Sequence, residues 1–564
     1  MNKKSFLILL AVFFLGAFLR FYNLGDVPAG FHRDEVFLGY NAHSLLKTGH
    51  DISGNFLPLH FKSFLFSPAG YSYFSIPFIA IFGLTEFSVR FASALFGSLT
   101  IIVTYCLVRE LFGYREKMQN HTRNNAEIVA LFSSFLLAIT PWHINLSRTA
   151  TENVIAVFFI ALGTLLYLRF LKSDKNYLLI LSFLLFGITI LIYQAPRVFL
   201  PFFIPLMILF TKDHLNIKKI KLQLLLFLTI IIIPLFFILL SKDFSLRMRT
   251  VSVFSTQQTQ LIIDEQIRGD GVSNLPVWLA KFFHNKPLGY SQQIITNYFK
   301  HFSYDFLFTD SGFPDRYRVP LTGLLYIFEL PLLIFGGLFL FINNKKIGLF
   351  LISWVFLASL GSALTFDDVP NLQRTLLVFP ALSVVSGFGF LGIVSFLKDK
   401  RRILIPSMIL GSLIVLYSIF FYLHQYYVHM NMYRPWYRND GYKELIGKVN
   451  VLLPGYQKAI VTNYESAPTI FFLFYTNYNP SAFQKQTKSS TLKDFDRIAF
   501  ANYEFSQEQC PVRIEEGQNG TFLIGEKNIL YVNSGLCKVP KGVKILEEVR
   551  RGDNSLVFRI IALR

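Results

Sequence analysis

Long apolar segments separated by short polar connections constrain the fold of this sequence more than any other feature. A helix needs about 20 mostly apolar residues to cross the hydrocarbon core of a bilayer. Eleven segments come close enough to this length to be predicted as spans. They are residues 6–21, 90–112, 127–142, 153–171, 177–193, 197–211, 222–240, 320–342, 347–364, 375–397 and 403–423. Only 16% of the 564 residues are charged, against about a quarter in soluble domains. We therefore expect an α-helical polytopic membrane protein.

The basic residues predict how these spans are oriented. They gather in every second short connection, as the positive-inside rule requires of cytoplasmic loops. The residues concerned are Lys3, Lys4, Arg115, Lys117, Arg123, Lys172, Lys175, Lys212, Lys218, Lys219, Lys221, Lys345, Lys346, Lys398, Lys400, Arg401 and Arg402. We expect a multi-pass protein of the bacterial plasma membrane with a cytoplasmic N-terminus and an extracytoplasmic C-terminal part. The net charge of +19 then reflects topology and contacts with membrane lipids, with no nucleic acid as partner.

Two apolar segments need an interpretation of their own. The first, residues 6–21, resembles a signal peptide, but no small-x-small cleavage site follows it, so we predict a retained anchor. Residues 64–86 contain Pro68, Gly70 and Pro77 and have no basic cytoplasmic connection beside them. We predict a re-entrant or interfacial helix on the outer side for that segment.

The hydrophobic runs end near residue 425, which predicts a membrane domain over 1–425 and an extracytoplasmic α/β domain over 426–564. Tyrosines and Trp436 follow the last span and suit the membrane interface. Strands are predicted at 459–462, 497–501, 521–524, 529–532 and 556–561, and a helix at 442–449. Cys510 and Cys537 both fall in this domain, where they form a disulfide or remain two free thiols.

An acidic pair, Asp34 and Glu35, follows the first span by about ten residues. Carboxylates are costly near lipid, so the pair is either an ordinary solvated loop or a functional group. The predicted topology places several cations and polar side chains on the same outer side as this pair. Asp367 and Asp368 also lie there, and we expect them to form only a solvated loop.

The order of motifs around the acidic pair resembles a known family. The stretches "LRFYNLGDVPAGFHRDE", "LLKTGHDISGNFLPLHF", "PAGYSYFSIPFIAIFGLTEFSVRFASALFGSLTI" and "LLAITPWHINLSRTATEN" are similar to bacterial glycosyltransferases. This glycosyltransferase family 39-like group joins protein O-mannosyltransferases with lipid A aminoarabinose transferases. The resemblance is strong over about residues 10–200, weaker to 425 and negligible beyond. It implies a C-type glycosyltransferase fold of about 11 spans, whose acidic outer loop faces a polyprenyl-phosphate sugar donor.

The resemblance also implies roles for individual residues. Asp34 aligns with the catalytic acid of the family and is our candidate for the base that takes the acceptor proton. Glu35 either orients Asp34, binds a cation, holds the acceptor or is a solvated neighbour. Arg90 aligns with a family arginine near the acidic pair, which indicates a salt bridge or a phosphate contact.

Further cations are candidates for binding the donor phosphate. Lys62 stands where aminoarabinose transferases carry a phosphate-contacting lysine. The acid that those relatives place just before it as a metal ligand is missing here, so a divalent metal is an open question, with His60 or His32 as substitute ligands. Arg197 and Arg374 end outer helices, where a guanidinium either binds phosphate or extends to the membrane interface.

The predicted function is transfer of a hexose or pentose from a polyprenyl-phosphate donor, with inversion, to a protein, lipid or envelope-glycan acceptor. The alternative from another class is a polytopic transporter or a flippase for lipid-linked sugars. The sequence shows no obvious inverted repeat and few ionisable residues within the spans, which disfavours transport. A scaffold that displays the outer domain would leave the acidic loop unexplained.

Overall fold

A computed structural model describes residues 3–61, 67–113, 120–240, 251–255, 257–489, 497–517 and 520–563. Lys62, residues 64–66, Arg115 and Lys117, which carry predictions, lie outside these ranges. The chain forms two compact units. The helical unit comprises Met1–Tyr22, Ser93–Ser147 and Thr151–Tyr422, and the mixed unit comprises Asn23–Ala92, Arg148–Ala150 and Leu423–Arg564. The mixed unit thus joins the acidic loop to the C-terminal part, and the division at residue 425 stays a prediction.

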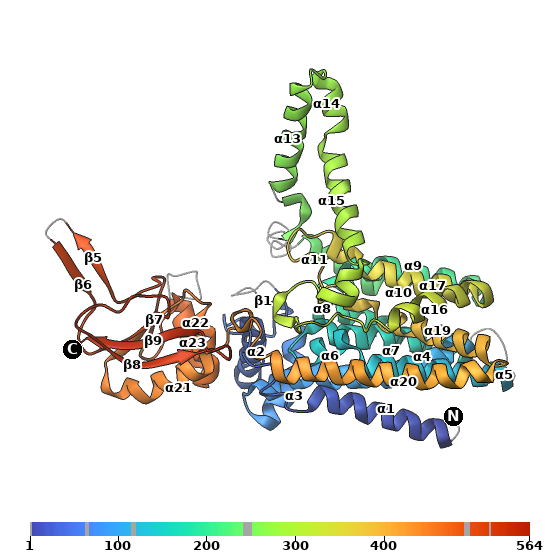
Figure 1. The fold of residues 1–564 in the computed structure, drawn as a ribbon, viewed down its shortest axis with the longest axis horizontal. Helices are drawn as coiled ribbons and strands as arrows, with labels where there is room; N and C mark the ends of the chain where they lie inside the picture. Colours follow the sequence, from blue (N-terminus) through green and yellow to red (C-terminus); the bar gives the residue numbers. More distant parts are fainter. Residues whose placement is uncertain are drawn as a thin grey trace. The chain divides into compact units, whose positions relative to one another are not determined.

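Each predicted span coincides with a helix over most of its length (Figure 1). The spans predicted at 320–342 and 375–397 start too early, because their helices begin only at Glu329 and Ala381. The helices are α1 (Lys3–Phe21), α4 (Glu86–Gly113), α5 (Asn120–Ile139), α7 (Glu152–Ser173), α8 (Asn176–Ile192), α9 (Ala195–Thr211), α10 (Ile217–Leu226) with its continuation α11 (Ile233–Leu240), α16 (Glu329–Asn343), α17 (Lys345–Ala358), α19 (Ala381–Leu397) and α20 (Arg401–His424). In the described ranges, seven helices are long and apolar enough to cross a membrane, or eight if the bent pair formed by α5 and α6 (Pro141–Ser147) counts as one span. The protein is a multi-pass membrane protein, and the count of eleven spans stays a prediction.

Small residues allow close helix packing in the helical unit. Gly336 of α16 lies against the backbone of Val385, and Gly389 of α19 lies against the backbone of Leu332. In both places a Cβ atom would overlap a carbonyl oxygen. This reciprocal contact of glycines is how membrane helices bring their backbones together without a hydrophobic driving force.

A helical hairpin projects from the helical unit between α11 and α16 (Figure 1). We call it the arm; it consists of α13 (Gln258–Val272), α14 (Val277–Phe283) and α15 (Lys286–Lys300). Residues 258–272 form the outgoing limb and residues 277–300 the returning limb. The arm runs across the direction of the long helices of this unit.

The mixed unit begins with α2 (Arg33–Thr48), the short antiparallel strands β1 (His60–Phe61) and β2 (Ser67–Pro68), and α3 (Gly70–Phe82). Its C-terminal part has a five-stranded sheet in the order β4-β3-β7-β9-β8. The strands are β3 (Lys458–Thr462), β4 (Tyr503–Ser506), β7 (Ile529–Ser534), β8 (Val543–Arg550) and β9 (Leu556–Leu563). Strand β3 runs parallel to β4 and β7, whereas β9 is antiparallel to β7 and β8. Helices α21 (Tyr442–Leu452), α22 (Pro468–Tyr475) and α23 (Pro480–Ser489) complete this α/β part.

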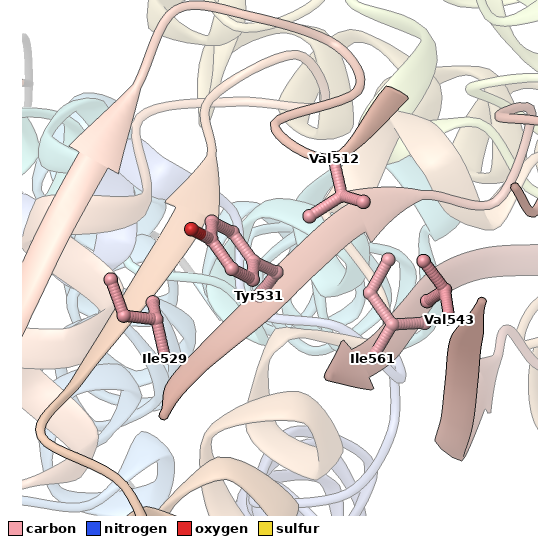
Figure 2. Close-up of a cluster of buried hydrophobic side chains, with 5 residues drawn as sticks. All are labelled: Val512, Ile529, Tyr531, Val543 and Ile561. Atoms are coloured by element: carbon pink, nitrogen blue, oxygen red, sulfur yellow. The ribbon is translucent and has the colours of Figure 1, made fainter. Parts of the chain in front are cut away.

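One face of the sheet carries a cluster of buried side chains (Figure 2). The cluster comprises Val512, Ile529, Tyr531, Val543 and Ile561. Val512 precedes β5 (Arg513–Gly517), which forms an antiparallel hairpin with β6 (Gly520–Ile524). Cys510, two residues before Val512, forms a disulfide with Cys537, which decides between the two alternatives that the sequence left open. The bond fastens the base of the hairpin to the segment that follows β7.

The strand prediction was partly right. The predicted strands at 459–462, 521–524, 529–532 and 556–561 and the helix at 442–449 are confirmed. The strand predicted at 497–501 is wrong, because the chain turns there. Phe500 and Tyr503 exchange backbone hydrogen bonds across this turn, and Ala501 takes a φ of 48°. Strand β4 begins only at Tyr503.

Candidate active site

Asp34 lies in the first turn of α2. His32 is the N-cap of this helix, and its Nδ1 accepts the backbone N–H of Asp34 at 3.2 Å. The side chain of Asp34 is 29% exposed, with His32 Nδ1 at 3.5 Å and Arg33 Nε at 3.9 Å. A helix N-terminus favours a carboxylate, since the backbone N–H groups and the helix dipole are both positive there. Asp34 is therefore held as an accessible carboxylate.

Glu35, the other half of the pair, is buried and is 5% exposed. Arg90 donates to both of its carboxylate oxygens, Nε to Oε2 at 3.0 Å and Nη2 to Oε1 at 3.2 Å. The backbone N–H of Ala150 donates to Oε2 at 2.8 Å. Glu35 thus fastens α2 to α4 and to the segment Arg148–Ala150. Two adjacent acids of one helix thus have different surroundings: Asp34 is partly exposed and Glu35 is buried.

Arg90 is fully buried and uses all five of its N–H groups within the mixed unit. Besides Glu35, its acceptors are the carbonyl oxygens of Leu24, Pro28 and Gly30, at 3.3, 3.2 and 2.8 Å. The salt bridge that the sequence left open is therefore present. This geometry disfavours a phosphate contact by Arg90, because a ligand would first have to displace one of these acceptors.

Two further buried arginines hold the loop that leads into α2. Arg148 donates to the carbonyl of Val27 at 2.9 Å and to the hydroxyl of Tyr426 at 3.1 Å, and it lies 5.1 Å above the Tyr426 ring. Arg438 donates to the carbonyl of Ala29 at 2.9 Å. Burial lowers the pKa of Arg438 to about 10. Together with Arg90, these side chains donate hydrogen bonds to the carbonyl groups of residues 23–32 and hold this loop in place. We name it the arginine-held loop.

Arg438 and the anchoring role of Arg148 were not predicted from the sequence. Tyr426, predicted to face the membrane interface, is instead buried beneath Arg148. The available signal was compositional: arginines that alternate with tyrosines after residue 425 suit cation–π contacts as well as they suit an interface.

The polar residues of the connection after α2 serve local structure. Asp51 is buried and accepts the N–H groups of Ser53 and Asn55, both at 2.9 Å. Gln484 of α23 donates to the Asp51 carbonyl at 2.9 Å and so joins this connection to the C-terminal part. Within α2 itself, burial lowers the pKa of the His43 imidazole.

A divalent metal held by His60 or His32 stays a prediction. No three His, Cys, Asp or Glu side chains gather as a metal site in the part of the chain that the structure describes. His60 Nδ1 lies 3.0 Å from the carbonyl of Phe61, and His32 caps α2. Lys62, the predicted phosphate ligand, lies outside the described residues.

Arg197 and Arg374 belong to the helical unit. Arg197 is buried in the first turn of α9 and donates through Nε to the carbonyl of Ile190 at 3.1 Å. Arg374 is half-buried and donates to Thr365 Oγ1 at 2.7 Å and to the Asp367 carbonyl at 2.9 Å. It also pairs with the Asp367 carboxylate at 3.2 Å. Burial raises the pKa of the neighbouring Asp368. This acidic loop is therefore more structured than the solvated loop expected from sequence.

Most of the segment that matches a known protein family lies in the helical unit. Residues 67–237 match the family model described as dolichyl-phosphate-mannose-protein mannosyltransferase. Over this segment the chain is similar to a family of membrane glycosyltransferases. The resemblance read from the sequence is thereby confirmed. The matched segment begins after Asp34 and Glu35, so the roles of these two acids stay predictions.

Two relatives share parts of the sequence. An "Uncharacterized protein" of Aquifex aeolicus (strain VF5) is 28% identical over 222 residues, which are 39% of this chain and 40% of the relative. The "Putative mannosyltransferase YkcB" of Bacillus subtilis (strain 168) is 26% identical over 194 residues, 33% of this chain and 24% of the relative. The alignments therefore span less than half of each relative.

Solved structures with a similar chain trace include two that contain a lipid phosphate. One is the archaeal oligosaccharyltransferase AglB from Archaeoglobus fulgidus in complex with an inhibitory peptide and a dolichol-phosphate. It has a TM-score of 0.48 and 13% identity, covering 84% of this chain and 63% of that one. The other is ArnT from Cupriavidus metallidurans bound to undecaprenyl phosphate. It has a TM-score of 0.46 and 12% identity, covering 99% of this chain and 97% of that one.

Proposed function

We propose that this protein transfers a sugar from a polyprenyl-phosphate donor to an acceptor at the outer face of the bacterial plasma membrane, with Asp34 as the base. The observation that carries the proposal is the family match over 67–237, since the matching family acts on a dolichyl-phosphate sugar. The acidic pair supports it, because Asp34 is accessible while its neighbour Glu35 is held by Arg90.

The chemistry assigns a different role to each acid. Asp34 accepts the proton of the acceptor nucleophile as that atom attacks the anomeric carbon. The bond from that carbon to the phosphate oxygen breaks, the configuration inverts, and the polyprenyl phosphate leaves. Glu35 does not take part in proton transfer, because its oxygens are already occupied by Arg90 and Ala150. Its role is to position the first turn of α2.

Fixed cations stabilise the departing phosphate. Arg374 fits this role better than Arg197, because it is less buried and its present partners include a carboxylate that phosphate can replace. Lys62 retains the role that the family resemblance implies. Whether the sugar is a hexose or a pentose, and whether a protein, lipid or glycan accepts it, is a matter for mass spectrometry of envelope glycans with and without the protein.

The test is turnover of a polyprenyl-phosphate sugar by purified full-length protein in liposomes. Asp34→Asn keeps the shape of the side chain but removes the proton acceptor, so turnover should fall by roughly 10²-fold or more. Asp553→Asn, at an exposed acid, is the matched control. Turnover of the Asp34→Asn variant near that of the control would refute the assignment of the base. Movement of solute or lipid-linked sugar without donor consumption would refute the enzyme and favour a transporter.

A further inference from the structure

The two limbs of the arm differ in charge. The outgoing limb carries three acids, Asp264, Glu265 and Asp270, and one cation, Arg268. The returning limb, residues 277–300, carries three lysines and no carboxylate. A helical segment with lysines and no acids is suited to a negatively charged surface.

The two limbs pack against each other along their inner sides. Ile263 of α13 is buried and fills the space that Gly289 leaves on α15, where a Cβ atom would lie 2.7 Å from Ile263 Cδ1. Near the tip, Asp270 Oδ2 lies 3.0 Å from His284 Nε2. The outward side chains of the arm are therefore not needed to hold the hairpin together.

Those outward side chains include large apolar ones on the returning limb. Trp278 is 72% exposed and Phe282 is 67% exposed. Leu288, Ile295 and Phe299 are also exposed, and their spacing of seven and four residues places them on one side of α15. Lys281, Lys286 and Lys300 are interspersed with this apolar surface. Such a mixture of Trp, Phe, Leu and Lys is typical of helices that lie in the membrane interface.

The direction of the arm fits a membrane surface. It runs across the long helices of its own unit (Figure 1). Helices that cross a bilayer stand roughly along the bilayer normal, so a hairpin across them extends along the plane of the membrane. The predicted topology places residues 241–318 on the outer side.

From these observations we propose that the returning limb of the arm docks on the outer leaflet of the membrane. Its partner is a lipid surface: the apolar side chains enter the boundary between headgroups and acyl chains, and the lysines contact anionic headgroups. This docking is independent of the proposed sugar transfer.

The base of the arm gives the docking a consequence. Asn297 donates to the carbonyl of Thr365 at 2.9 Å, and His301 Nε2 lies 2.8 Å from Ser362 Oγ. Thr365 is the residue whose hydroxyl accepts from Arg374. A docked arm therefore holds the segment that presents Arg374, and only this consequence rests on the proposed function.

The experiment measures lipid contact in the full-length protein, one copy per nanodisc. Cys106→Ser leaves only introduced cysteines reactive, because Cys510 and Cys537 are joined. A fluorophore is attached at Ser291→Cys, an exposed polar position of the returning limb, or at Gln266→Cys, an exposed position of the outgoing limb. The discs contain phosphatidylethanolamine, phosphatidylglycerol and a phospholipid with a doxyl quencher near the headgroup.

We expect the label at position 291 to be quenched at least about twofold more than the label at position 266. Trp278→Ser with Phe282→Ser should abolish that difference. Lys281→Glu with Lys286→Glu should reduce it in the anionic discs, while discs of phosphatidylcholine alone should show less quenching from the start. Equal quenching at both positions would overturn the proposal. So would a label at position 291 that is shielded from water but not quenched by lipid, since a protein would then cover the limb.

Discussion

Arg90 Nε and Glu35 Oε2 lie 3.0 Å apart, and neither side chain is open to solvent. Removing one partner of such a pair leaves an uncompensated buried charge. We expect Arg90→Ala to destabilise the protein by about 3–5 kcal/mol. Arg90→Lys should restore little of this, because an ammonium cannot reproduce the planar fork that reaches Glu35 and three carbonyl oxygens. Thermal unfolding in detergent measures both changes, with Arg33→Ala at an exposed arginine as control. Equal unfolding midpoints for the Arg90→Ala and Arg33→Ala variants would contradict the clamp.

Substitution of Arg374 distinguishes a role in binding the donor phosphate from a purely structural role. If it stabilises the leaving phosphate, Arg374→Ala should cost about 2–4 kcal/mol in the transition state and leave acceptor binding nearly unchanged. Arg374→Lys should recover only part of the rate. Single-turnover rates per folded molecule are the measurement. Arg402→Ala, on the predicted cytoplasmic side, is the control, and rates for Arg374→Ala equal to this control would exclude the phosphate role.

His301 should make the stability of the folded protein depend on pH. Burial lowers the pKa of His301 to about 4, and Arg374 and Lys300 add to this shift. The unfolded chain therefore takes up the proton first as the pH falls below the ordinary histidine value of about 6.5. The native state is undisturbed above that pH and loses stability as the pH falls toward about 4. At pH 5 the loss amounts to about 2 kcal/mol. His301→Gln should weaken this dependence in unfolding curves recorded at neutral and acid pH. An unchanged dependence would show that other groups cause it.

The disulfide should stabilise the C-terminal part of the mixed unit. Cys510 and Cys537 are 27 residues apart in sequence, and removing a native bond of this kind costs about 2–4 kcal/mol. Replacing both cysteines by serine should increase cleavage of the β5–β6 hairpin region in limited proteolysis of the full chain. Cys106→Ser, which breaks no bond, should cleave like the wild type. The same cleavage pattern in the double variant would mean that the sheet holds this hairpin without the bond.

Two glycines should respond to the same substitution with opposite signs. Alanine is the better helix former by about 1 kcal/mol, so Gly411→Ala should be neutral or stabilising, because nothing lies within 4 Å of its Cβ position. Gly389→Ala should destabilise the protein by about 1–3 kcal/mol, because its Cβ would overlap the Leu332 carbonyl. Unfolding midpoints of the two variants make the comparison. A gain for both would mean that α16 and α19 separate readily.

The helices could be predicted from the sequence because a membrane span depends on a local property, a sufficient run of apolar residues. The strands β3, β7 and β9 were recognised for a similar reason, since their β-branched and aromatic residues form short uninterrupted runs. The turn at Phe500 was missed, because residues 497–501 are apolar enough for a strand and contain neither Gly nor Pro.

The surroundings of the acidic pair could be predicted only in part. The family resemblance drew attention to Arg90, which stands 55 positions from Glu35. Nothing local indicates that Arg438 holds Ala29, 409 positions earlier in the chain. Contacts of this range depend on the completed fold. For the same reason the division between open Asp34 and closed Glu35 could not be read from two adjacent acids.

The arginine-held loop can be completed only late in the synthesis of this protein. Its anchors come from three places in the chain, and the last of them, Arg438, is translated after all the predicted spans. A ribosome therefore has to deliver almost four-fifths of the polypeptide before the entrance to α2 is complete. Nascent chains that stall or are cut before that point contain Asp34 but lack Arg438, which holds the loop before it. Under the proposed function, the order of translation would leave incomplete copies of the protein without the anchor that completes the entrance to α2.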